Sequence, residues 1–214
     1  MQRFFDIIFS GLAILLLAPI LVPIIFVLLF TGEGEVFYVQ DRVGKNGSII
    51  SLYKFATMLK DSEKKGTITI MNDPRILPFG KFLRKTKINE IPQLINVFIG
   101  DMSIIGPRPQ TKRCFSAFPH DSQKRIIEVR PGLSGIGSIV FRNEEMMLNE
   151  SVNHNNFYDD EIMPFKGLLE EWYVKNNSLK NYFILIFLTI FVVVNSRESI
   201  VWKIFKDLPY NRFS

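Results

Sequence analysis

The feature that most constrains this chain is an apolar run near its start, from Ile7 to Phe30, which carries no charged side chain. A helix of this length is long enough to cross a bilayer, since about 20 apolar residues suffice. Pro19 and Pro23 lie inside the run, where each removes a backbone donor and favours a kink. Two paths remain open: a kinked helix that crosses the membrane, or a re-entrant helix that breaks at Ala18-Pro19 and returns to the side it entered.

Length and composition narrow the class of protein. At 214 residues the chain is expected to form one domain, 32–214, attached to a membrane anchor, 1–31. A formal net charge of +5 suits a membrane surface or a phosphate-bearing ligand and is too weak to indicate nucleic acid. The single Cys114 excludes an internal disulfide and a cysteine-based zinc site, and it fits a reducing compartment.

A short β-hairpin is predicted after the apolar run. The strand-like residues 36–40 and 49–55 flank Asn46-Gly47, and this dipeptide between apolar runs is a strong hairpin signal. Two short strands are too few for a sheet core. The fold is therefore expected to be mostly α with a small β-hairpin.

Further helices are expected in the second half of the chain. Residues 110–128 are predicted to be helical in part, 163–174 follow a helical pattern, and 138–141 look like a short strand. Residues 182–194 are uncharged but shorter than a bilayer span. With the aromatic and basic residues that follow, they predict an interfacial helix at about 180–206, although a second transmembrane helix stays open.

The densest chemistry lies between Arg84 and Pro109. Apolar residues recur there at helical spacing from a start near Asn89, which would sit at or beside the N-cap. A helix N-terminus attracts phosphate, and nearby arginines would strengthen that attraction. Glu90 at such an anion site has two interpretations: it holds Mg²⁺ against phosphate oxygens, or it only complements the helix dipole. A second loop, opening with Arg130-Pro131-Gly132, could hold an anion or be a plain turn.

These segments together carry a family likeness. The chain resembles the bacterial sugar transferases that are monotopic polyprenyl-phosphate phosphoglycosyl transferases. The likeness rests on motifs in family order: Gln40-Asp41-Arg42-Val43-Gly44, Lys54-Phe55-Ala56-Thr57-Met58, Leu83-Arg84 through Val97, Gly100 through Pro109, Arg130 through Gly135, and Arg142-Asn143.

The resemblance implies a reaction and a place in the cell. Such enzymes move a sugar 1-phosphate from a UDP-sugar to undecaprenyl phosphate with Mg²⁺, at the cytoplasmic face of the bacterial inner membrane. It implies an N-terminal membrane-embedded helix, re-entrant at Ala18-Pro19, packed on a small cytosolic catalytic domain with interfacial helices. The lipid bilayer is then a partner, nucleic acid is not, and the oligomeric state stays open, a homodimer included.

The resemblance also assigns residues. Glu90 would hold Mg²⁺, Lys54 would support the donor site, and Glu170 could pair with an arginine such as Arg84. The arginines expected to neutralise phosphates are Arg84, Arg108, Arg130 and Arg142.

Asn89 departs from the family pattern, because related enzymes carry there an aspartate that attacks phosphorus. An amide lacks the anionic oxygen that forms an acyl phosphate. Three explanations follow: transfer proceeds directly or through another carboxylate such as Glu90 or Asp101, the chain is a scaffold without turnover, or the change was made deliberately. Ala56, where the family usually has a basic residue, removes one positive charge near the expected donor site.

Overall fold

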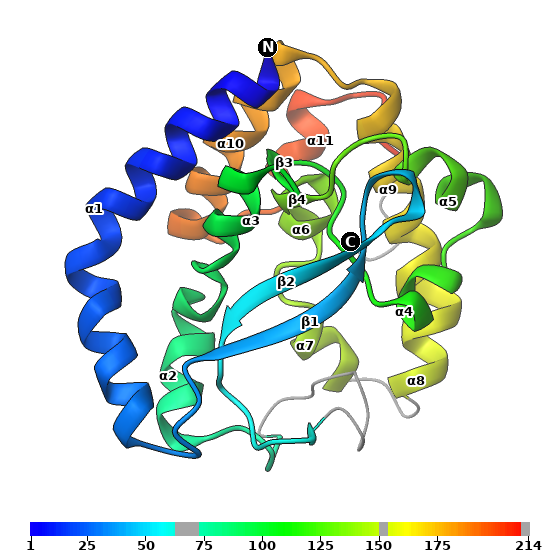
Figure 1. Cartoon of the computed structure of the whole chain (residues 1–214). Helices are drawn as coiled ribbons and strands as arrows, with labels where there is room; N and C mark the ends of the chain where they lie inside the picture. The colour runs from blue at the N-terminus through cyan, green and yellow to red at the C-terminus, as the bar shows by residue number, and fades with distance from the viewer. Residues whose placement is uncertain (63–72, 150–153, 211–214) are drawn as a thin grey trace.

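The computed structural model of the protein describes residues 1–62, 73–149 and 154–210 (Figure 1). It is mostly helical. The α-helices are α1 (Gln2–Phe30), α2 (Pro78–Lys85), α3 (Gln93–Ile99), α4 (Lys112–Ser116), α5 (His120–Ile126), α6 (Ile136–Val140), α7 (Glu144–Asn149), α8 (His154–Phe157), α9 (Met163–Lys175), α10 (Leu179–Asn195) and α11 (Ile200–Ile204). The remaining elements are strands β1 (Phe37–Val43), β2 (Ile49–Phe55), β3 (Ser103–Ile105) and β4 (Gly132–Ser134), the 3₁₀ turns η1 (Lys45–Gly47) and η3 (Ile88–Glu90), and the π-helical turn η4 (Tyr158–Ile162).

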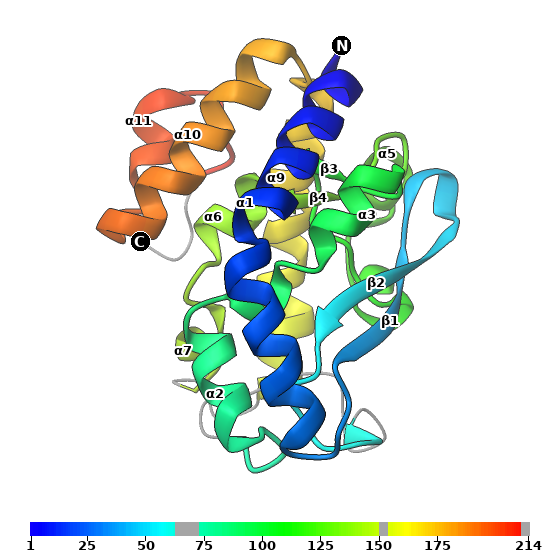
Figure 2. The same ribbon diagram turned by 60° about the vertical axis from the view of Figure 1, so that its left-hand side comes forward.

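Helix α1 is continuous through Pro19 and Pro23, and it is the one helix of the described chain long and apolar enough to cross a membrane. It runs along one side of the molecule (Figures 1 and 2). Near its start, Arg3 donates to the carbonyl groups of Val97 and Phe98 at the end of α3. Near its end, Leu28 packs in a buried cluster with Phe55 and Leu83. Both ends of α1 therefore contact the same body.

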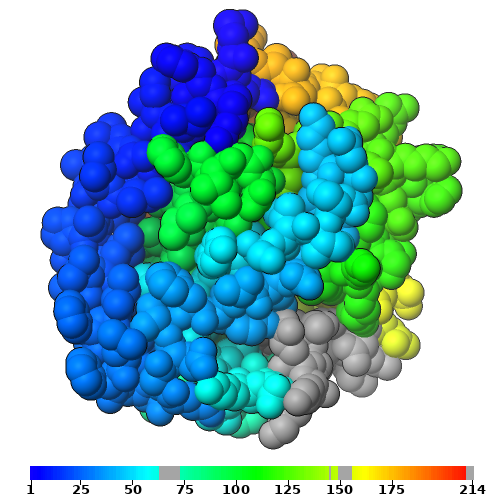
Figure 3. All heavy atoms as spheres, viewed as in Figure 1, coloured from blue at the N-terminus to red at the C-terminus, as the bar shows by residue number. Residues whose placement is uncertain are grey.

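Strands β1 and β2 form the predicted antiparallel hairpin, with Phe37 opposite Phe55 and Val43 opposite Ile49. The turn places Asn46 and Gly47 at positive φ, which Asn and Gly adopt at low cost. The space-filling view shows the hairpin lying across the face beside α1 (Figure 3). The hairpin thereby forms one wall for residues that come from α2 and η3.

A second, parallel pair joins β3 to β4, with Ser103 opposite Gly132 and Ile105 opposite Ser134. The two backbones approach so closely that a Cβ on Gly132 would stand 2.1 Å from the nitrogen of Gly106. Glycine is thus required at this crossing for lack of space. The crossing holds the loop that begins with Gly106 and leads to Arg108 against the rest of the fold.

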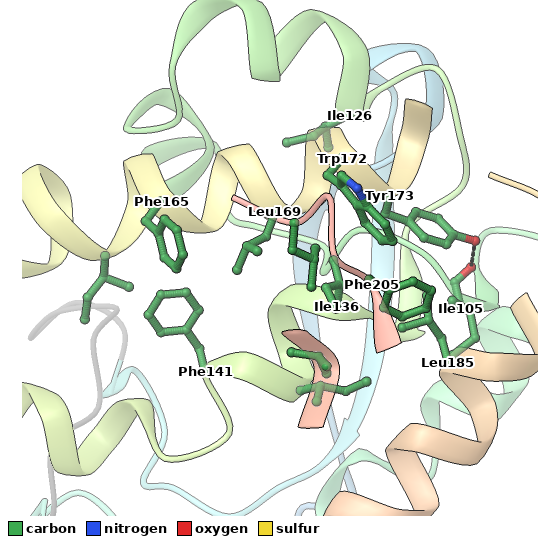
Figure 4. Packing of buried hydrophobic residues seen from close by; sticks show 14 of the residues in the cluster. Ile105, Ile126, Ile136, Phe141, Phe165, Leu169, Trp172, Tyr173, Leu185 and Phe205 are labelled. Atoms are coloured by element: carbon green, nitrogen blue, oxygen red, sulfur yellow. Dashed lines mark hydrogen bonds between the residues drawn. The ribbon is translucent and has the colours of Figure 1, made fainter. Parts of the chain in front are cut away.

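The main core surrounds α9. Aromatic and aliphatic side chains from α6, α9, α10 and α11 interlock there, with Phe141 edge-on to Phe165 (Figure 4). The Tyr173 hydroxyl donates to the Ile105 carbonyl at 3.1 Å, the dashed line in that view. Helix α9 therefore reaches strand β3 directly, and the predicted helix at 163–174 is confirmed.

Three expectations about local structure are wrong. Residues 138–141 belong to helix α6 and its cap, not to a strand. The predicted single helix at about 180–206 is two helices, α10 and α11, because Ser196 turns the chain with a φ of 48°. The central helix starts at Gln93, not near Asn89: the preceding residues form the 3₁₀ turn η3, and Pro92, which has no N–H to donate, is the N-cap of α3.

Candidate active site

One open cavity of about 1590 Å³ gathers most of the predicted site residues. Its walls include Lys54 from β2, Arg84 from α2, Asn89 and Glu90 from η3, Arg108 after β3, and Arg142 after α6. Arg130 does not line this cavity. Its side chain is exposed, and its Nε donates to the Gly100 carbonyl at 2.7 Å.

Glu90 and Arg108 form the ion pair at the centre of the cavity, with Arg108 donating to Glu90 Oε1 at 2.9 Å. The Glu90 side chain is 19% exposed. Burial raises the pKa of Glu90, but the charges of Arg108 and Lys54 outweigh that effect and lower it to about 2. The same pairing raises the pKa of Arg108. Glu90 is thus a permanent anion held beside a permanent cation.

Asn89 lies inside turn η3 and does not cap a helix, which corrects the capping interpretation. Its side chain is buried, and its Oδ1 has no hydrogen-bond partner in the described structure. A buried polar atom without a partner costs free energy, so native proteins rarely keep one without a use. The amide oxygen beside Glu90 is therefore available to a ligand or a cation in the cavity.

Lys54 faces the same centre. Burial and the nearby charge of Arg42 lower the pKa of Lys54 to about 7, although the charge of Glu90 opposes the shift. The lysine is therefore near the midpoint of its titration at neutral pH. An added phosphate would favour its charged form, because an opposite charge close by stabilises a cation.

Glu170 supports Arg108 from behind. Its Oε1 accepts from the backbone N–H of Arg108 at 3.1 Å, in place of the expected contact with Arg84. Burial raises the pKa of Glu170 to about 7, and its Oε2 is buried without a partner in the described structure. Gly137 leaves the room for this carboxyl group, since a Cβ there would stand 2.3 Å from Oε1. Glu170 thus fixes the backbone that presents the Arg108 guanidinium.

Lys166 is a wall residue that the sequence reasoning missed. It is buried in α9, and its Nζ donates to both carboxylate oxygens of Glu144, at 2.9 and 3.0 Å. The signal was a lysine at an apolar position of the helical pattern, three residues after Met163 and three before Leu169. A charge placed on the buried face of a helix indicates a paired partner across the site.

The remaining candidates are less central. Arg142 lines the cavity and donates to the Val193 carbonyl at 3.2 Å, at the end of α10. Asp101 is not among the lining residues, and its Oδ2 accepts from Asn96 at 3.4 Å. Of the two carboxylates named as substitutes for an attacking aspartate, Glu90 alone faces the cavity.

The donor atoms at the centre fit a magnesium ion. Among the residues that the structure describes, no three His, Cys, Asp or Glu side chains gather as a metal cluster. Mg²⁺ at nucleotide sites needs only one or two carboxylates, because substrate phosphates and water supply the other oxygens. Glu90 offers a carboxylate, and Asn89 offers an amide oxygen that has no partner in the described structure.

Comparison with known proteins places this cavity in context. The model of a family described as "Bacterial sugar transferase" matches residues 1–196. The chain is 29% identical over 91% of its length to the undecaprenyl-phosphate galactose phosphotransferase of Salmonella typhimurium. It is 29% identical over 92% of its length to the exopolysaccharide production protein ExoY of Rhizobium meliloti. Over 65% of its length, it is 37% identical to the UDP-glucose:undecaprenyl-phosphate glucose-1-phosphate transferase of Escherichia coli.

The coverage of these relatives differs. The chain spans 40% of the Salmonella protein and 31% of the Escherichia coli protein, but 87% of the Rhizobium protein. The Salmonella and Escherichia coli proteins are therefore much longer than the part that matches this chain. All the site residues assigned from the sequence lie within the matched range of the family model.

Proposed function

Because the chain belongs to the bacterial sugar transferase family, we propose that it transfers a sugar 1-phosphate from a UDP-sugar to undecaprenyl phosphate. The observation that carries the proposal is the Glu90–Arg108 pair, set in a cavity that Lys54, Arg84 and Arg142 also line. Phosphoryl transfer needs positioning and charge neutralisation above all, and these side chains supply both.

The reaction exchanges one phosphorus–oxygen bond for another. An oxygen of the acceptor phosphate attacks the β-phosphorus of the donor, the bond from that phosphorus to the bridging oxygen breaks, and UMP leaves with the bridging oxygen. Arg108 and Lys54 offset the charge that gathers on the phosphate oxygens. Arg84 extends the cationic wall toward the nucleotide.

Most carboxylates that line the cavity already have hydrogen-bond or ion-pair partners, and this favours direct attack by the acceptor phosphate. Glu90 is paired with Arg108, Glu144 with Lys166, and Glu35 with Lys60, while Glu33 accepts from the backbone N–H of Lys60. Asp61, in the loop after β2, also lines the cavity, and it neighbours Lys60 in the sequence. A carboxylate already held by a cation is a weak nucleophile, because its charge is stabilised. Asn89 supplies no anionic oxygen. We therefore propose that the acceptor phosphate itself is the attacking group.

Magnesium belongs to the proposal. Glu90 and the Asn89 amide oxygen would hold the ion, and it would neutralise charge on the donor diphosphate. Glu90 carries its negative charge at every physiological pH, given the low pKa of its carboxyl group. The protein therefore needs no proton transfer to prepare this ligand.

The membrane placement is also proposed. We infer that α1 is re-entrant in the inner membrane and that the catalytic body lies on its cytoplasmic face. Support comes from the contacts of α1, since Asp6 bonds to β3 and Leu28 packs with Leu83, so both ends meet one body. The helix does not break at Ala18-Pro19, which corrects that expectation, so a re-entrant path depends on a kink at Pro19, where a backbone donor is missing.

The test of function uses membranes that contain the full chain. They are incubated with undecaprenyl phosphate and a panel of labelled UDP-sugars, and the released nucleotide is identified. Release of UMP is expected. Release of UDP instead would show transfer of the sugar alone, and no nucleotide release with any donor would show a scaffold without turnover. Either result would overturn the proposal.

A further inference from the structure

The cavity has two chemically different ends on either side of the Glu90–Arg108 pair. The basic end lies at α2 and the loop before it, and its cationic side chains are Lys60, Arg75, Lys81, Arg84, Lys85 and Lys87. Lys60 and Arg75 are paired with carboxylates. The apolar end lies between η3–α3, the β3–β4 pair and α10, and its side chains are Ile91, Leu94, Ile104, Leu133, Ile186 and Ile190. A nucleotide suits the basic end, which leaves the apolar end without an assigned occupant.

Helix α10 presents apolar side chains on two faces. One face, with Leu185, Leu188 and Val192, packs into the core. The other places Ile190 and Val193 beside the cavity, and they are 58% and 57% exposed. Large apolar side chains exposed at the rim of a cavity indicate a site for an apolar ligand.

The polar groups along this wall satisfy one another. Ser134 and Thr189 share a hydrogen bond of 2.8 Å between their hydroxyl oxygens, and Thr189 also donates to the Leu185 carbonyl. Their hydrogen-bonding capacity is thus largely taken up inside the protein. Apart from these two hydroxyls, the side chains that α10, the β3–β4 pair and α3 present to the cavity are aliphatic.

Arg142 is a cationic side chain between the apolar end and the Glu90–Arg108 pair. Arg142 donates to the Val193 carbonyl, and it lines the same cavity as Arg108. None of the described carboxylates forms an ion pair with Arg142. A ligand that fits this part of the cavity has an anionic head near Arg142 and Arg108 and a long apolar tail along α10.

Resting on the proposed function, we propose that the apolar end, formed by α10 and the β3–β4 pair, holds the first isoprene units of the lipid acceptor. The acceptor's phosphate then points to Arg142 and Arg108, and its tail runs along Ile186 and Ile190. The chemistry of the lining fits a polyprenyl phosphate, since the same cavity has both cationic and aliphatic side chains.

Helices α1 and α10 lie together at one end only. Helices α1 and α10 touch near their starts, where Phe5 and Phe9 meet Phe183. They then diverge, as Figure 2 shows, and α10 runs away from the second half of α1. The side chains that line the apolar end come from the part of α10 beyond this contact.

The test compares two substitutions on α10. Ile190→Gln makes the apolar end polar, while Phe187→Gln changes a side chain that is 69% exposed but does not line the cavity. For each variant, kcat/KM is measured with undecaprenyl phosphate and with the five-carbon isopentenyl phosphate. Ile190→Gln is expected to lower kcat/KM for the long acceptor by about tenfold and to leave the short one unchanged. Phe187→Gln should change neither. Equal effects of the two substitutions, or an equal loss for both acceptors, would overturn the proposal.

A binding experiment separates this inference from the proposed function. The full chain in membranes is labelled with a polyprenyl phosphate that carries a photoreactive diazirine on its second isoprene unit. Label on α10 or on residues 132–134 is expected, and label confined to α1 would refute the inference. The readout does not depend on turnover, whereas the nucleotide-release assay tests the reaction without locating the tail.

Discussion

Tyr182 donates a hydrogen bond of 2.9 Å to Oδ1 of Asp6, and this bond joins α10 to α1 across most of the sequence. The same oxygen accepts from the Ser103 hydroxyl at 3.0 Å and from the backbone N–H of Ile104 at 2.9 Å. Asp6 is buried, so one carboxylate oxygen holds α1, β3 and α10 together. Strand β3 continues into the loop that carries Arg108, which connects the apolar helix to the site.

Removing this junction is expected to destabilise the protein. Tyr182→Phe removes one hydrogen bond and should lower the free energy of unfolding by about 1 kcal/mol. Asp6→Leu leaves three donors without their acceptor and should cost about 3 kcal/mol. Denaturant unfolding in detergent micelles measures both effects. Tyr210→Phe, at a side chain that is 85% exposed, is the control and should change nothing.

Glu90→Gln is expected to abolish Mg²⁺-dependent turnover. The amide keeps the shape but loses the charge that Arg108 and a cation require, so kcat should fall by about a hundredfold or more. Release of UMP across a Mg²⁺ titration is the measurement. Glu35→Gln is the matched control, because this carboxylate lines the cavity and pairs with Lys60 at the rim. Unchanged turnover in Glu90→Gln would remove Glu90 from the mechanism.

Asn89→Asp tests the route of attack. The new carboxylate would lie beside Glu90 in the same buried turn, and it would supply the anionic oxygen that the amide lacks. We expect a phosphosugar adduct on intact-protein mass spectrometry of the variant incubated with donor alone, and no adduct on the native chain. An adduct on the native chain would mean that another of its side chains attacks phosphorus, and direct transfer would be wrong.

Lys54 is expected to make donor binding depend on pH. Its pKa is lowered to about 7, so its cation is present below pH 7 and lost above it. The affinity for a UDP-sugar should therefore fall by about tenfold as pH rises through 7, because one charged contact to the diphosphate disappears. Equilibrium binding from pH 6 to 9 measures this. Lys54→Arg should flatten the profile, since arginine stays charged. Glu170 is the other group whose pKa is about 7. The binding profile of Glu170→Gln is the control, and it should keep its dependence on pH if Lys54 causes that dependence.

The sequence predicts those elements of the fold that are determined by neighbouring residues, and it does not predict those that depend on distant segments. The hairpin was predictable because Asn46 and Gly47 tolerate the positive φ that the turn needs. The start of the central helix was not, because residues Ile88–Glu90 form a 3₁₀ turn, and the spacing of apolar residues does not separate such a turn from the first turn of an α-helix. The β3–β4 pair was missed as well. Three-residue strands have no periodicity, and their partners are far apart in the sequence.

In the candidate site, too, local motifs identified some residues, whereas contacts between distant segments could not be predicted. The motifs around Lys54, Glu90, Arg108 and Arg142 indicated side chains that line one cavity. The pairing of Lys166 with Glu144 joins α9 to α7, so no local pattern names its partner. The support that Glu170 gives to the Arg108 backbone depends on the space at Gly137, which appears only when the helices are packed.

The contacts that fasten both ends of α1 to one body have a kinetic consequence on the proposed placement. A protein held flat along a single leaflet cannot drift away from the lipid it uses, so the two substrates arrive by different kinds of diffusion. The nucleotide sugar reaches the site by three-dimensional diffusion in solution, whereas the lipid reaches it by two-dimensional diffusion in the membrane. Turnover should then follow the surface density of the acceptor, in molecules per area of bilayer, and not its bulk concentration.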